Sequence, residues 1–189
     1  GSKLLFVLIT LVITISSMIS AMLSVHLLTI LQAREIALAA AVALGAIVGP
    51  SQVGARAIEM LISRFHHPIW TKFASTVFVA TGVGLLWVGF PIIAAALIFY
   101  GAGIGIESIA RGTLPLAVFG EDRYASVMGR IAMPSLIMQA ASPSLGALLI
   151  DMFGANGALA AFLGLAIVNV ALVAALYAIL LKRGRPQAA

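Results

Sequence analysis

Long apolar stretches fill most of the chain, and short breaks that contain charge, glycine or proline separate them. Several stretches exceed 18 residues, which is enough α-helix to cross a hydrocarbon layer of about 30 Å. The strict alternation of apolar and polar positions that membrane β-strands require does not occur. The pattern therefore predicts an all-α membrane protein.

The breaks divide the chain into six predicted spans, because proline and glycine start or interrupt helices more readily than they continue them. Their approximate bounds are residues 4–31, 36–62, 73–88, 92–110, 125–150 and 158–181. Residues 1–3 are expected to be a cloning remnant, Gly1-Ser2, and a short N-terminal tail, and residues 182–189 a basic cytoplasmic tail.

Composition supports a lipid environment. The sequence is 62% hydrophobic and 9% charged, which is too apolar for 189 residues to fold around a water-soluble core. There is no cysteine and the histidines form no ligand pattern, so neither a metal site nor another cofactor is expected. The expected surroundings are membrane lipid.

The net charge of +5 predicts membrane orientation rather than binding to nucleic acid, because the basic residues lie in short loops between spans. Six spans place both termini on one side. With the termini inside, Arg34 is the outer basic residue, and the inner ones are Lys3, Arg64, Lys72, Arg111, Arg123, Arg130, Lys182, Arg183 and Arg185. This bias predicts a multi-pass protein of the bacterial cytoplasmic (inner) membrane with both termini cytoplasmic.

A weak internal symmetry relates the first three spans to the last three. The second span carries Gly49-Pro50-Ser51-Gln52, and the fifth carries Gln139 followed by Ser142-Pro143-Ser144. Breaks at corresponding places in two inverted triplets of spans are typical of transporters.

Three segments carry a resemblance to a known family: GPSQVGARAIE in the second span, RGTLPLAVFG with YASVMGRIAMP leading into the fifth, and the DMFGANGA turn before the last. With them, the chain resembles the C-terminal six-helix half of a major facilitator superfamily transporter. The resemblance implies that spans one and four line a cavity, two and five contact the other half, and three and six face lipid. It also implies a second six-helix half as partner, because complete members have twelve spans.

The expected function is therefore half of a secondary active transporter that moves a small solute by alternating access. Two alternatives remain open at this point: a folded but inactive half that needs a partner half, and a self-pairing homodimeric transporter. An enzyme is not expected, because an intramembrane protease would need a nucleophile elbow and a facing histidine, and the sequence offers neither around Ser51. The substrate is not identified by the sequence.

Two pairs of opposite charges are candidates for a gate or for ion coupling. Glu107 and Arg111 are four residues apart, and Arg56 and Glu59 three apart, which places each pair on one helix face. They could be self-paired residues at the membrane boundary, or pairs that form in one access state and break in the other. In the sharper version, Glu107 carries a proton.

The cavity candidates are small polar residues at helical spacing in the first span, together with an aromatic residue in the fourth: Thr14, Ser17, Ser20, Ser24, His26 and Tyr100. Their hydroxyls could instead bond to their own helix or mark a close helix contact. This neutral face argues against a highly charged substrate. Gln52 and Gln139 are interface candidates, and the glycines at 101, 103 and 105 are interpreted as close helix packing rather than a nucleotide loop.

Overall fold

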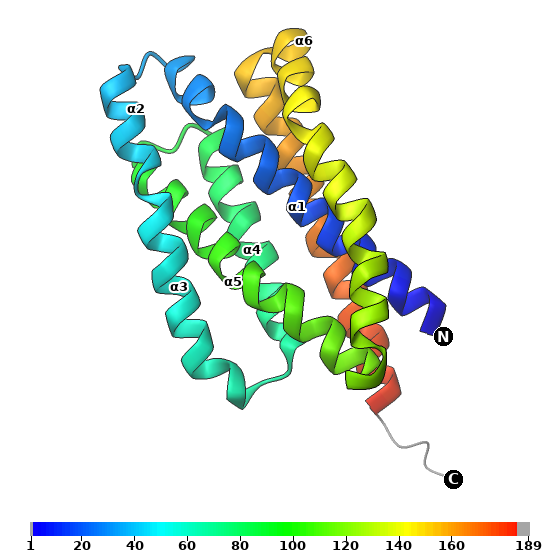
Figure 1. Cartoon of the computed structure of the whole chain (residues 1–189). Coiled ribbons are helices and arrows are strands. Elements are labelled where there is room, and N and C mark those ends of the chain that lie inside the picture. Colours follow the sequence, from blue (N-terminus) through cyan, green and yellow to red (C-terminus); the bar gives the residue numbers. More distant parts are fainter. Residues whose placement is uncertain (1, 185–189) are drawn as a thin grey trace.

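The computed structural model describes residues 2–184, which are helical except for short connections and contain no strand (Figure 1). The all-α prediction is confirmed. Five stretches are long and apolar enough to cross a membrane, judged by length and composition. The elements are α1 (Ser2–Gln32), α2 (Leu38–Gly45), α3 (Val48–Ile62), the 3-10 turn η1 (Ser63–Phe65), α4 (Pro68–Trp87), α5 (Ile93–Phe119) and α6 (Glu121–Gly184).

The long helix α6 folds back on itself at Gly154, whose backbone has φ 70° and ψ 174°. Only glycine adopts this conformation without a steric cost. Val127 and Val173 are buried in the same apolar cluster, although a straight helix would hold them about 69 Å apart at 1.5 Å per residue. The two arms, residues 121–153 and 155–184, therefore form a hairpin, visible as the yellow and orange-red segments of Figure 1.

The boundaries of α4 and α5 differ from the predicted ones. The loop expected to extend through Lys72 ends at His67, because Pro68 begins α4 and the His67 ring accepts a hydrogen bond of 3.1 Å from the amide of Ile69. Helix α5 continues past the expected end at Ala110 to Phe119 and stops at Gly120, which has φ 77°. The expected tail begins inside α6, and Gly1 and residues 185–189 lie outside the described residues.

Two apolar clusters occupy the two ends of the bundle. The cluster near the Gly154 turn, here the turn-side cluster, includes Leu27, Ile30, Val83, Leu86, Leu97 and Phe162. The cluster near the chain termini, here the terminus-side cluster, includes Leu5, Ile9, Ile69, Leu114, Ile131 and Val173. Helices α1, α4, α5 and both arms of α6 contribute to each cluster. A group of their buried polar residues lies between the two clusters and forms a polar layer: Ser17, Lys72, Ser75, Glu107, Ser135 and Asn169.

Glycines allow α5 to pack closely against two neighbours. A side chain at Gly103 would meet the backbone of α4, with Val79 N at 2.8 Å and Ser75 O at 2.9 Å. A side chain at Gly101 would meet Val48 O of α3 at 2.7 Å. The interpretation of these glycines as sites of close helix packing is confirmed.

Helix α4, which the resemblance predicts to face lipid, also carries a buried polar face. In the 18-residue apolar stretch of α4, 44% of the residues are buried. In the corresponding stretch of Leu38–Phe65, 6% are buried. Lys72, Ser75 and Thr76 are buried on α4, and this polar face turns the helix toward its neighbours. In the last arm of α6, Asn169 is also buried. The peripheral element is the α2–α3 pair.

The glycine contacts predict a position-specific loss of stability. Gly103→Ala should lower the free energy of unfolding by about 1–3 kcal/mol, because the added methyl group forces α4 and α5 apart. Denaturant titration in mixed detergent micelles measures this difference.

Gly164→Ala is the matched control, because Gly164 lies inside a helix with no atom within 4 Å of an added methyl group. It should be neutral or stabilising by up to about 1 kcal/mol. Equal stabilities of the two variants would contradict the packing described for α4 and α5.

Candidate functional site

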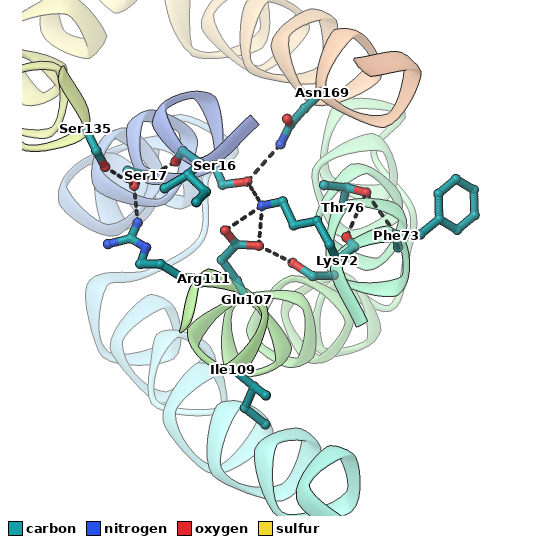
Figure 2. Close-up of polar contacts among 12 residues, drawn as sticks. Ser16, Ser17, Lys72, Phe73, Thr76, Glu107, Ile109, Arg111, Ser135 and Asn169 are labelled. Carbon is teal, nitrogen blue, oxygen red and sulfur yellow. Dashed lines mark hydrogen bonds and ion pairs between the residues drawn. The ribbon is translucent and has the colours of Figure 1, made fainter. Parts of the chain in front are cut away.

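A buried ion pair between α4 and α5 lies at the centre of the polar layer. The Lys72 ammonium donates to both carboxylate oxygens of Glu107, at 2.5 and 2.6 Å, and to Ser16 Oγ at 2.9 Å (Figure 2). Ser75 donates to Glu107 Oε2 at 2.8 Å. Lys72 is 0% exposed and Glu107 8%. Because an ammonium has three donors, all of those on Lys72 are used.

Two adjacent serines of α1 connect this ion pair to the rest of the bundle. Ser16 accepts hydrogen bonds from Lys72 of α4 and from Asn169 Nδ2, the latter at 2.8 Å. Ser17 shares a hydrogen bond of 2.8 Å with Ser135 and accepts one from Arg111 (Figure 2). Consecutive helical residues point about 100° apart, so the two hydroxyls reach different neighbours. Through them α1 contacts α4, α5 and both arms of α6.

A cavity of about 290 Å³ lies beside these contacts. Residues of α1, α4, α5 and the first arm of α6 line it, with the largest share from α1 and α5. Six residues singled out in the sequence line this cavity: Ser17, Ser20, Tyr100, Glu107, Arg111 and Gln139.

The remaining cavity candidates of α1 lie elsewhere. Thr14 is buried, and its hydroxyl has no hydrogen-bond partner in residues 2–184. Ser24 is exposed. His26 bonds through Nε2 to the carbonyl of Pro143 at 2.8 Å, and Gly146 leaves room for its ring. This contact joins α1 to the first arm of α6.

Neither candidate charge pair is formed among the described residues. Glu107 pairs with Lys72 rather than with Arg111, which bonds to Ser17 instead. Glu59 accepts a hydrogen bond of 2.6 Å from Thr71 and contacts His66 at 3.4 Å, while Arg56 on the same helix is exposed. In both cases a partner on another element replaces the neighbour on the same helix, because tertiary packing buries the acid against that element.

The interface candidates have different surroundings. Gln52 is half-buried, and its backbone packs against α5 where Gly105 leaves space. Gln139 is exposed and also lines the cavity. The cavity therefore extends toward the exposed face of the first arm of α6.

Sequence reasoning missed the basic half of the ion pair and several of its polar neighbours. Lys72 was assigned to a loop, although the His67-Pro68 start signal places it inside a helix. Asn169 does carry a signal, because a strongly polar residue in an otherwise apolar helix is expected to point inward. Ser16, Ser75 and Ser135 carry no comparable signal, because serines are common in such helices.

The site offers a mixture of charged and neutral groups around an empty volume, suited to holding a small polar solute. Within residues 2–184, no three histidine, aspartate or glutamate side chains come together in a way that could hold a metal ion. No family model, curated protein or solved structure matches the chain. The function is therefore argued from the site alone.

The geometry predicts that removing one charge of the ion pair lowers the stability more than removing both charges. Lys72→Met should lower the free energy of unfolding by about 3–5 kcal/mol, because it leaves the Glu107 carboxylate buried without its cation. Adding Glu107→Gln should recover a large part of that loss. A double-mutant cycle in mixed micelles measures the coupling.

Lys182→Met is the matched control, because Lys182 is exposed at the end of α6. It should change the stability by less than about 0.5 kcal/mol. Additive effects of the Lys72 and Glu107 substitutions would contradict the ion pair.

Proposed function

We propose that this chain is one half of a secondary active transporter that moves a small solute across a membrane by alternating access. The observation that carries the proposal is the polar layer and its cavity, enclosed between the turn-side and terminus-side apolar clusters. In a transporter, such clusters separate a central solute site from the two aqueous sides.

The proposed membrane arrangement has six passes: α1, α2 with α3, α4, α5 and the two arms of α6. The five long apolar helices and the reversal at Gly154 support it. The polar layer would then lie near the middle of the bilayer, where ionised side chains are costly and usually belong to a substrate or ion path. The arrangement is that of half a major facilitator superfamily transporter.

Exposed apolar side chains support a partner half. The second and fifth proposed passes carry Val53, Ile58, Met60, Met133, Leu136 and Ile137 on their surfaces. Because Gln139 is both exposed and in the cavity lining, a second half packed on the fifth pass would complete the cavity wall. The partner is another six-helix half, from a second copy or from a separate chain.

The distribution of basic residues supports cytoplasmic termini in this arrangement. Lys72 and Arg111 belong to the polar layer and no longer count toward orientation. Lys3, Arg64, Arg123, Arg130 and Lys182 still lie at the terminus-side end of the proposed passes, against Arg34 at the other. Among the cavity residues, Glu107 is the carboxylate, so it remains the candidate for ion coupling.

Alternating access predicts that the cavity can be reached from both sides of the membrane. The sequence has no cysteine, so Ser108→Cys in the cavity lining introduces a single reactive thiol. A membrane-impermeant thiol reagent should modify it when applied to right-side-out vesicles and also when applied to inside-out vesicles. Mass spectrometry of the intact protein measures the modification.

Ala110→Cys is the matched control, because Ala110 lies on the same helix and is fully buried. It should stay unmodified from either side. Modification of Ser108→Cys from one side alone would contradict alternating access and favour a static pocket.

A further prediction concerns the partner half. If a second copy supplies it, the purified protein in a lipid nanodisc should have twice the chain mass of 19.5 kDa, because the exposed passes pair across a twofold axis. Native mass spectrometry measures this. A stable monomer that shows no cavity access from either side would support the alternative of a folded but inactive half that needs a separate partner chain.

A further inference from the structure

The charges around the cavity do not balance. Arg111 and Glu107 line it, and Lys72 bonds to Glu107 from α4. The other lining residues are serines, Tyr100, Gln139 and aliphatic side chains. Two cations and one carboxylate therefore leave one net positive charge beside the cavity.

Glu107 cannot neutralise Arg111 as well as Lys72. Its Oε1 accepts from Lys72, and its Oε2 accepts from Lys72 and Ser75. Arg111 forms no ion pair with any described residue, and the one hydrogen bond described for its guanidinium goes to the neutral Ser17. A guanidinium has five N–H donors, so most donors of this cavity-lining residue have no partner among the described residues.

The lining hydroxyls add further donors. Ser16 Oγ already accepts two hydrogen bonds, from Lys72 and Asn169, so its own proton is free to be donated. Ser20 also lines the cavity, where its hydroxyl lies beside that of Tyr100, and the Tyr100 hydroxyl donates to the Ser20 carbonyl oxygen at 3.3 Å. The cavity is therefore rich in donors, while its carboxylate acceptor is occupied.

We propose that this cavity binds a small organic monoanion, whose carboxylate pairs with Arg111 while Ser16 and Ser20 donate to its oxygen atoms. The proposal names the substrate class of the transporter site argued above and rests on that function. A guanidinium matches a carboxylate in a two-point arrangement. The volume of about 290 Å³ equals the share of about ten water molecules in the liquid, which suits a ligand of several heavy atoms.

A role for Arg111 as a charge at the membrane surface does not explain the contact that its side chain makes. A side chain that only extends toward the membrane surface would point toward the terminus-side end of α5. Instead, the Arg111 side chain donates a hydrogen bond to Ser17 on α1. Ser17 is only 2% exposed. Within the polar layer, a single negative charge on the ligand balances the local charge, whereas a neutral or cationic ligand leaves Arg111 unpaired.

The test compares matched ligands that differ only in charge. The probes are lactate with lactamide, benzoate with benzamide, and nicotinate with nicotinamide, each added to the protein in nanodiscs at constant ionic strength. A ligand that binds the folded state raises the temperature of unfolding. At least one carboxylate should raise it in a saturable way, while its amide should not.

Nitrate and phosphate form a second arm, which separates an organic anion from an inorganic one. Saturable stabilisation by a carboxylate that exceeds that by both inorganic ions supports the proposal. Stabilisation only by an inorganic ion overturns the organic part of it. No stabilisation by any carboxylate, or equal stabilisation by a carboxylate and its amide, overturns it entirely.

Substitutions of arginine then locate the site. Arg111→Gln should weaken carboxylate binding by about 10- to 100-fold, because it removes a charge-assisted hydrogen bond, and Arg111→Lys should weaken it less. Arg64→Gln is the matched control, because Arg64 is exposed outside the cavity, and it should bind as the unsubstituted chain does. Equal affinities of the Arg111→Gln and Arg64→Gln variants overturn the assignment. If Arg111→Gln does not fold, Arg111→Lys and the carboxylate–amide comparison decide.

Uptake into liposomes separates this inference from the proposed function. Carboxylates that bind but are not transported would leave the anion site intact and overturn the transporter. Transport of amides without discrimination against them would leave the transporter intact and overturn the anion site.

Discussion

The arrangement of the helices depends on one electrostatic constraint: a buried lysine and a buried glutamate must meet. An ionised group in an apolar interior is tolerated only when it is paired and hydrogen-bonded. Lys72 and Glu107 come from α4 and α5, so their contact at 2.5 Å sets the rotation and height of these helices relative to each other. Ser16, Ser75 and Asn169 are then required around them, because the remaining donors and lone pairs need partners. The ion pair thus determines which face of α1 turns inward.

Close backbone approach makes this polar layer possible. Gly82 on α4 and Gly103 on α5 let the two backbones come near enough for the lysine and glutamate side chains to meet without stretching. The apolar clusters on either side then lower the local dielectric around the ion pair, which strengthens it. Packing and electrostatics are therefore coupled here: looser packing would admit water and weaken the pair, and loss of either charge would leave a buried ion at the tightest helix contact.

The coarse fold was predictable from the sequence because hydropathy and glycine or proline breaks act locally. The reversal at 151–157 and the close packing at Gly101 and Gly103 follow from such signals. The partners of the charged residues were not predictable in this way. Spacing along one helix suggested Glu107 with Arg111, but the partner of Glu107 is 35 residues earlier in the chain, and only the three-dimensional arrangement of α4 against α5 brings it there. Treating Lys72 as a loop residue also left the buried polar face of α4 unrecognised.

The contact between Arg111 and Ser17 connects ligand binding to helix packing. A ligand shifts a conformational equilibrium only by interacting differently with the two states. Ser17 lies between α5 and the first arm of α6, since it bonds to both Arg111 and Ser135. If the proposed anion binds, it would use guanidinium donors that Ser17 leaves free, and a shift of Arg111 toward it would change the contact between α5 and α1. Under the proposed function, Arg111 would be the group through which a bound solute acts on the packing of α1 against α5 and α6.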